Sequence, residues 1–295
     1  MTRTRYATPE ALRAALDARL LTQQHSTGRD PNWLRRRLAL VRLLVRLTDH
    51  APHAWILKGG LAVELRRPGR ARSTRDVDLV LRPGLVADPC QATAVREALL
   101  DALAIDVDSD GLVYSLGRPA RFRHDAYGQP AWRFPVEAAL AGRSFAHARL
   151  DLVAQPDEIS GVEQRELPDL LGFAGIPSRT IWVTDLRQQF AEKLHALTHT
   201  YSTGESSRVK DLIDLVLLIE DGVPADADLV SVARHLFGVR HEQPVPCELG
   251  PVPSSWQEPF PVLAAEVGLS TTSHDEARAL VAAHWQRAVA HSPGR

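Results

Sequence analysis

Apolar residues recur every three or four positions over two stretches near the N-terminus, which predicts two amphipathic helices. The first covers residues 9–24 and carries Leu12, Leu16 and Leu20 on one face. The second begins at Asp30-Pro31, where an N-cap residue precedes a proline at the first helical position. Its apolar stripe is formed by Leu34, Leu38, Val41 and Val45.

The pattern then changes to short elements that alternate between helix and strand. A strand at residues 55–57 leads into Lys58-Gly59-Gly60, and residues 61–67 continue as a helix. A second strand covers residues 76–82, and a helix follows over residues 90–103. Further strands are predicted as a weak pair at 112–116 and 119–123, and as half-buried strands at 132–140 and 145–153.

After residue 155 the composition changes. Residues 156–180 read as mixed loop and short helix, and the pattern is helical from Thr184, the expected cap, nearly to the end. One further helix covers residues 208–220, residues 241–257 are an irregular proline-rich crossing, and Ser273 with Glu276 caps a last helix that runs to about Ala290. The sequence therefore predicts a mixed α/β domain over residues 1–155 and a mainly helical domain over residues 156–295.

The strand at 76–82 starts with two carboxylates on one face. Residues two apart in a strand point to the same side, so Asp76 and Asp78 project together while Val77 enters the core. Two adjacent carboxylates need a neutralising partner, and divalent cations are the usual one. Asp151, on the polar face of the strand at 145–153, is a third candidate ligand. The alternative for each is a solvated surface carboxylate.

Gly59 and Gly60 form a turn that opens a helix, where bare backbone N–H groups can bind phosphate. A strongly positive loop follows, and it carries Arg66, Arg67, Arg70, Arg72 and Arg75. Guanidinium groups in such a loop suit the phosphates of a polyanion. A phosphate cradle beside metal-holding carboxylates is the arrangement of a nucleotidyl-transfer site.

Lys193 stands on an otherwise apolar helix face, with Leu186, Phe190 and Leu197. Such a lysine either extends to solvent or points into a cleft, where it would supply a positive charge for a triphosphate. Asp211 and Asp214 are three residues apart on the next helix and share a face. One of them is placed to orient Lys193 or Arg208, unless the pair forms an exposed acidic face.

Composition limits the kinds of partner and of site that the chain can have. The 295 residues are 44% hydrophobic and carry a formal net charge of -1, so any nucleic acid must be held by a local patch. The two cysteines, Cys90 and Cys247, exclude a disulfide scaffold and a cysteine zinc site. No signal-peptide core or membrane-spanning apolar run is present, so we expect a cytoplasmic protein that does not bind membranes.

Four motifs together resemble the AbiEii/AbiGii-type nucleotidyltransferase toxins, and most closely their MenT branch. They are Lys58-Gly59-Gly60, Ser73-Thr74-Arg75-Asp76-Val77-Asp78, Lys193-Leu194-His195-Ala196, and Arg208-Val209-Lys210-Asp211-Leu212-Ile213-Asp214-Leu215. The resemblance covers roughly residues 30–220 and places the chain in the polymerase-β-like nucleotidyltransferase superfamily. It implies a bilobed toxin that transfers nucleotides from an NTP to the 3′ end of tRNA, which blocks translation, and a cognate antitoxin.

The resemblance also assigns roles. Asp76 and Asp78 match the metal carboxylates for Mg²⁺ or Mn²⁺, and Asp151 is matched to the third carboxylate. Lys193 matches the catalytic lysine, and Asp214 matches the second-lobe catalytic aspartate, with Asp211 as the alternative register. Lys58, Gly59, Gly60, Lys193 and Arg208 are the expected NTP contacts. The five loop arginines are the expected tRNA contacts.

Regulation and alternatives complete the expectations. Thr74 occupies a position where related toxins carry a hydroxyl that a kinase-like antitoxin can phosphorylate, and Ser73 is its neighbour. We expect a monomer. The alternatives are a nucleotidyltransferase that acts on a small molecule or a protein hydroxyl, and a degenerate module that only binds RNA or an antitoxin.

Overall fold

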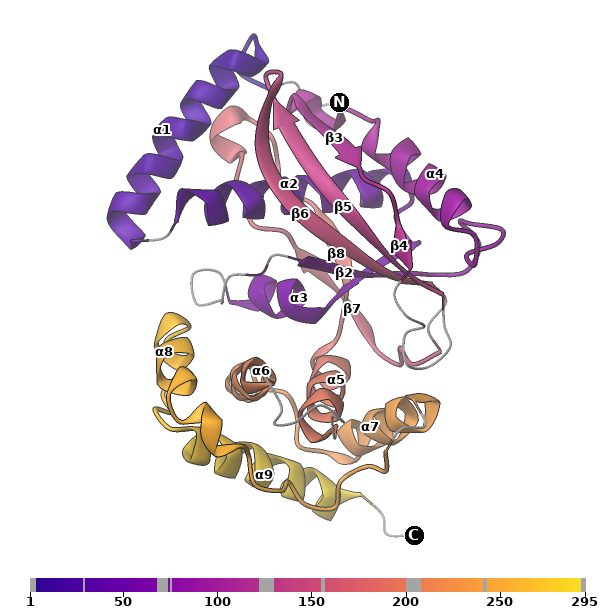
Figure 1. The fold of residues 1–295 in the computed structure, drawn as a ribbon, viewed down its shortest axis with the longest axis vertical. Helices are drawn as coiled ribbons and strands as arrows, with labels where there is room; N and C mark the ends of the chain where they lie inside the picture. Colours follow the sequence, from indigo (N-terminus) through magenta and orange to yellow (C-terminus); the bar gives the residue numbers. More distant parts are fainter. Residues whose placement is uncertain are drawn as a thin grey trace. The chain divides into compact units, whose positions relative to one another are not determined.

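The structure is a computed structural model of the chain, and its course is drawn in Figure 1. It describes residues 4–28, 30–67, 74, 76–121, 130–154, 157–199, 208–240 and 243–292. Helices and strands are mixed within the chain, which confirms the predicted α/β class. Among the described helices, none combines the length and the apolar character needed to cross a bilayer.

The chain divides into two compact units, which are described separately below. The first unit consists of Met1–Leu57, Ser73–Pro156 and Gln164–Val183, and the second of Lys58–Arg72, Asp157–Glu163 and Thr184–Arg295. The sequence predicted one boundary, between residues 155 and 156. That boundary stays a prediction, and the two units described here each consist of several segments of the chain.

One sheet organises the first unit, with the strand order β3-β5-β6-β2-β1-β8-β7 and with β4 paired to β5. The strands are β1 (Trp55–Lys58), β2 (Asp76–Leu81), β3 (Leu112–Leu116), β4 (Ala120–Arg121), β5 (Ala131–Leu140), β6 (Arg143–Ala154), β7 (Val162–Glu166) and β8 (Thr180–Thr184). β2 runs parallel to β6, whereas β5 runs antiparallel to it. The long strands β5 and β6 lie side by side (Figure 1).

Three helices of the first unit follow the predicted apolar stripes. They are α1 (Pro9–Thr27), α2 (Pro31–His50) and α4 (Ala92–Leu103). Asp30 caps α2 by accepting a hydrogen bond from Asn32 N, as the Asp-Pro signal predicted. α2 packs against α1, α4 and β6, so its buried leucines and valines lie against the sheet.

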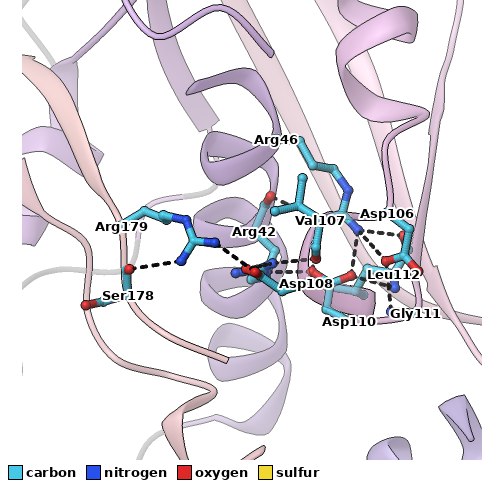
Figure 2. Close-up of polar contacts among 10 residues, drawn as sticks. All are labelled: Arg42, Arg46, Asp106, Val107, Asp108, Asp110, Gly111, Leu112, Ser178 and Arg179. Carbon is cyan, nitrogen blue, oxygen red and sulfur yellow. Dashed lines mark hydrogen bonds and ion pairs between the residues drawn. The ribbon is translucent and has the colours of Figure 1, made fainter. Parts of the chain in front are cut away.

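A buried ionic network joins α2 to the turn η1 (Val107–Ser109), as Figure 2 shows. Arg42 donates Nε to Asp110 Oδ2 at 2.5 Å, and Arg46 donates Nη2 to Asp110 Oδ1 at 2.5 Å. Asp108 accepts from Arg42 and from Arg179. Burial alone would raise the pKa of Asp110, but its bonds to Arg46 and Arg42 lower it below the usual range. This carboxylate therefore stays charged inside the unit.

The second unit is built from helices around one apolar core. The helices are α3 (Gly59–Arg66), α5 (Leu186–Thr198), α6 (Val209–Glu220), α7 (Ala227–Arg240), α8 (Pro259–Glu266) and α9 (His274–His291). The short turn η3 (Ser254–Trp256) also belongs to this unit, whereas the short turn η2 (Gly172–Ala174) belongs to the first unit. α6 packs against α3, α5, α8 and α9. Its leucines and valines are almost all fully buried, which fits the central position of this helix in the core.

Three local expectations differ from the structure. The strands at 112–116 and 120–121 do not pair with each other, because both pair with β5. The stretch 156–180, expected as loop and short helix, contains β7 and the start of β8. The cap of α5 is Asp185, which accepts from Gln188 N, whereas Thr184 ends the preceding strand. In the two strand cases the pairing of distant segments overrides the local signal, whereas the cap of α5 is a local contact that lies one residue further on.

Candidate active site

Three carboxylates of the first unit lie on one face of β2 and β6. The parallel register pairs Asp76 with Arg149 and Asp78 with Asp151. The residues between them, Val77 on β2 and Leu150 on β6, are fully buried on the opposite face. The alternation predicted from sequence therefore holds, and it brings Asp78 and Asp151 to neighbouring positions about 4.8 Å apart across the strands.

Two arginines bind these carboxylates in bidentate fashion. Arg149 donates Nε to Asp76 Oδ1 at 2.7 Å and Nη2 to Asp76 Oδ2 at 2.8 Å. Arg133, which is the register partner of Asp151 on β5, donates Nε to Oδ1 at 2.7 Å and Nη2 to Oδ2 at 2.6 Å. The hydrogen bonds to Asp151, with the charges of Asp76 and Asp78, raise the pKa of Arg133 above its usual range. We call these three carboxylates and two arginines the acidic centre.

The acidic centre has the oxygen donors that Mg²⁺ or Mn²⁺ prefers. The donors do not yet converge, since among the described residues no three histidine, cysteine or acidic side chains come together as a metal-ligand set. Both oxygens of Asp76 and both oxygens of Asp151 are held by a guanidinium. The chemistry of these oxygen donors fits a divalent cation. In this structure the arginines bind the carboxylates of Asp76 and Asp151 that the cation would use.

In the second unit, Lys193 lies between two carboxylates. Its Nζ is 2.9 Å from Asp211 Oδ1 and 2.8 Å from Asp214 Oδ2. Arg208 Nη1 also reaches Asp211 Oδ2, at 3.5 Å. The Asp214 side chain is 1% exposed and that of Lys193 is 13% exposed, so this ion pair is largely shielded from water. The expectation that one aspartate orients Lys193 is met by both of them.

The glycine turn has the conformation that its sequence requires. Gly59 begins α3 with a φ of +68°, in the left-handed region that favours glycine. Lys58, at the N-cap position, makes no side-chain cap to the helix, so the first turn of α3 keeps backbone donors that no capping side chain satisfies. This is the condition under which a helix start binds phosphate.

Lys58 itself binds a carboxylate of its own unit. Its Nζ donates to Glu158 Oε1 at 3.0 Å, and Arg240 donates Nε to Glu158 Oε2 at 2.8 Å. Burial alone would lower the pKa of Lys58, but Glu192 and Glu158 raise it. Burial alone would raise the pKa of Glu158, but Lys58 and Arg240 lower it to about 2. Lys58 is thus a charged, paired residue, and its expected contact with NTP stays a prediction.

The expected arginine loop begins later than the sequence indicated. Arg66 is the last residue of α3, is 2% exposed in its side chain, and pairs with Glu163. Arg67 follows α3 and pairs with Glu220 and Asp221. Both guanidinium groups are therefore engaged inside the second unit, and their contact with tRNA stays a prediction.

The other loop residues fall elsewhere. Arg70, Arg72, Arg75 and Ser73 lie outside the described residues. Thr74 is described, and it is buried, with 9% of its surface exposed. Phosphorylation at Thr74 or Ser73 stays a prediction.

Sequence reasoning did not single out the arginines of the acidic centre. The signal for Arg149 is its position two residues before Asp151, on the same strand face. Arg133 had no comparable signal, because only the antiparallel pairing of β5 with β6 places it beside Asp151. Glu158 and Arg240 were missed for the same reason, being far apart in sequence and joined by the fold.

A glycine turn that opens a helix, an Asp-x-Asp strand and a carboxylate on the adjoining parallel strand are features of nucleotidyl transferases, and this protein is one. Residues 42–294 match the family described as "Nucleotidyl transferase AbiEii toxin, Type IV TA system". The match spans most of the chain, and the protein belongs to this family of toxins from type IV toxin–antitoxin systems. None of the curated proteins matches the sequence.

Solved structures similar to this one include nucleotidyltransferases. JHP933 from Helicobacter pylori has 15% identity and a TM-score of 0.44, over 86% of this chain and 95% of that chain. An antigenic nucleotidyltransferase-like protein from Paracoccidioides brasiliensis has 14% identity and a TM-score of 0.41, over 70% and 93%. The antibiotic-resistance factor ANT(2″)-Ia has 15% identity and a TM-score of 0.35, over 69% and 94%. The family match, and not these distant likenesses, assigns the class.

Proposed function

We propose that this toxin transfers a nucleotide from an NTP to the 3′ end of tRNA in a reaction that depends on a divalent cation. The observation that carries the proposal is the row of carboxylates on parallel strands β2 and β6, in a chain of a nucleotidyl transferase family. Carboxylate oxygens on one strand face are the donors that a divalent cation prefers, and such a cation assists nucleotidyl transfer.

Each part of the chain has a role in this proposal. Asp76, Asp78 and Asp151 would hold Mg²⁺ or Mn²⁺, which when bound lowers the pKa of an acceptor hydroxyl and neutralises charge on pyrophosphate. Lys193 supplies a positive charge for the triphosphate, and Asp211 and Asp214 fix its position. The first turn of α3 offers backbone N–H groups to phosphate oxygens.

The tRNA acceptor is supported by the sequence. With a formal net charge of -1, the chain has no global positive field, so a polyanion needs a local patch. Arg70, Arg72 and Arg75 form such a patch in the sequence directly before β2. A cytoplasmic location, a monomeric state and contact with the cognate antitoxin remain predictions.

The test is transfer of label from each of the four NTPs to tRNA or to protein. The wild-type protein should label tRNA with Mg²⁺ or Mn²⁺, and a chelator should abolish the signal. Asp76→Ala should remove transfer and growth arrest, because it deletes a metal ligand. Since exposed ion pairs contribute about 1 kcal/mol or less, Asp76→Ala should leave the free energy of unfolding nearly unchanged.

The matched control is Asp101→Ala, which removes an exposed aspartate of α4. This variant should keep full activity. Label in protein and not in tRNA would replace the tRNA acceptor with a protein hydroxyl. Full activity of Asp76→Ala with Mg²⁺ would refute the role of the acidic centre.

A further inference from the structure

The acidic centre already contains its own counter-ions. Arg149 on β6 covers both oxygens of Asp76, and Arg133 on β5 covers both oxygens of Asp151. All four residues belong to three adjoining strands of one unit, so the sheet itself fixes their spacing. Bidentate pairing places one N–H donor on each of the two carboxylate oxygens, so any other ligand must share these oxygens with the guanidinium.

Both arginine side chains are partly accessible to water. The Arg149 side chain is 50% exposed and that of Arg133 is 35% exposed, whereas Asp151 is 14% exposed. The Arg149–Asp76 pair is the more accessible to water, since the Asp76 side chain is also 31% exposed, and water and salt screen such a pair. An arginine side chain has several rotatable bonds, and its head can leave one anion for another without a change in the strand.

A divalent cation and these arginines compete for the same oxygens. A cation bound by Asp76, Asp78 and Asp151 would displace both guanidinium groups from the carboxylates. The displaced arginines would still lie close to the cation, and the positive charges would repel one another. The phosphates of a nucleotide remove this conflict, because they add negative charge and accept bidentate bonds from arginine. Cation and nucleotide should therefore bind together far better than the cation binds alone.

We propose that Arg133 and Arg149 are exchangeable counter-ions of the acidic centre, which hold Asp151 and Asp76 in the empty protein and transfer to nucleotide phosphates when a divalent cation takes the carboxylates. The inference rests on the proposed function, since it takes Asp76, Asp78 and Asp151 as the cation ligands. In this role the arginines are positioning residues. They prevent the site from filling with cation in the absence of nucleotide, and they couple the two binding events.

The test is a titration with Mn²⁺, followed by electron paramagnetic resonance of the free ion, with and without a non-hydrolysable NTP analogue. In the wild type, the analogue should strengthen Mn²⁺ binding markedly. Without the analogue, Arg149→Gln and Arg133→Gln should each bind Mn²⁺ about tenfold more tightly than the wild type. One opposite charge changes the proton affinity of a neighbouring carboxylate by about tenfold or more, and we expect a similar effect on its affinity for a cation. Both variants should bind the analogue about tenfold less tightly, for the same reason.

Two controls separate this effect from a change in the fold or in total charge. Arg143→Gln removes an exposed arginine from the start of the same strand, β6, and should change neither affinity. Thermal unfolding should show that Arg149→Gln and Arg133→Gln fold like the wild type. Arg149→Lys keeps the charge but not the fork, and should lie between the wild type and Arg149→Gln.

Failure of this inference differs from failure of the proposed function. If Mn²⁺ binding is lost in Asp76→Asn but is equal in the wild type and both glutamine variants, the acidic centre binds the cation and the arginines do not compete for it. If no variant binds Mn²⁺ in a manner that depends on Asp76, the acidic centre is not the cation site. That second result overturns both proposals, whatever the arginine variants do.

Discussion

Asp110 is a fully buried carboxylate, and it balances two buried arginines of one helix. Its oxygens accept from Arg42 and Arg46, and the Arg46 side chain, like that of Asp110, is 0% exposed. Such a group is weak evidence for added stability, because desolvation cancels most of the attraction. Removing the Asp110 carboxylate is a different matter, since Arg42 would keep Asp108 but the buried Arg46 would lose its buried carboxylate partner.

We expect Asp110→Ala to lower the free energy of unfolding by about 3–5 kcal/mol, the usual effect of breaking a buried ion pair from one side. Chemical denaturation followed by circular dichroism measures this change. Asp106→Ala is the matched control, because Asp106 lies 3.8 Å from the same Arg46 but is 55% exposed. The control should lose about 1 kcal/mol or less. Equal losses in the two variants would contradict the importance of burial here.

At the scale of elements, α5 presents two ionisable groups that depend on its neighbours. Lys193 is held by two aspartates of α6. Two residues later, the Nδ1 atom of His195 accepts from Arg240 Nη1 at 3.2 Å, and its ring packs edge-on against Phe237 of α7. A guanidinium can only donate, so this contact requires a neutral imidazole nitrogen. Helix packing thus sets the ion-pair partners of Lys193 and the charge state of His195.

We expect Lys193→Ala to raise the NTP concentration needed for half-maximal transfer while tRNA affinity stays nearly constant. The same variant leaves Asp211 and Asp214 without their lysine, and we expect it to lower the free energy of unfolding by about 3 kcal/mol. Steady-state kinetics, filter binding and denaturation measure the three effects. Lys193→Arg restores the charge and should recover most of the stability. Loss of tRNA binding at unchanged NTP affinity would refute the role of Lys193 as a phosphate ligand.

Stability should also depend on pH through His195. Burial, followed by the charge of Arg240, lowers the pKa of His195 to about 4, whereas in the unfolded chain it is about 6.5. Between these values the unfolded state binds a proton that the folded state does not, so stability falls as the pH drops below about 6.5. We expect a loss of about 2 kcal/mol by about pH 5 from this group.

Urea denaturation at about pH 7.5 and about pH 5 measures the loss. In His195→Gln, which keeps an acceptor for Arg240 but cannot titrate, the difference between the two pH values should shrink by about the same amount. The remaining dependence includes His284, whose pKa burial also lowers. An equal pH dependence in the variant and the wild type would show that His195 is not the responsible group.

At the scale of the whole molecule, charge is nearly balanced. With 35 basic and 36 acidic residues, the chain attracts nucleic acid only through a local patch. Replacing Arg70 and Arg72 with alanine should therefore weaken tRNA binding. If each contacts one phosphate, the slope of log affinity against log salt should flatten by about two units.

Filter binding at several salt concentrations measures this slope. The matched control replaces Arg143 and Arg234, two exposed arginines at other places in the chain, and should leave the slope unchanged. An unchanged slope in the Arg70 and Arg72 variant would move tRNA to another surface.

The sequence by itself determined the elements and the identity of the carboxylates. Helix periodicity and capping are local, so α1, α2 and α9 begin where the Thr8, Asp30 and Ser273 side chains accept backbone hydrogen bonds. Strand alternation is local too, and it placed Asp76 and Asp78 on one face without knowledge of the partner strand. Family motifs then indicated the class of reaction.

Only the tertiary structure decided which charges meet. Arg133 reaches Asp151 because β5 and β6 pair in one register, and a shift by one residue would turn it to the other face. Glu158 joins Lys58 to Arg240 across 100 and 82 positions of sequence. Local patterns fix which way a side chain points relative to its own backbone. The partner of a charge depends on strand register and helix packing, which are set by the burial of apolar residues distributed over the whole unit.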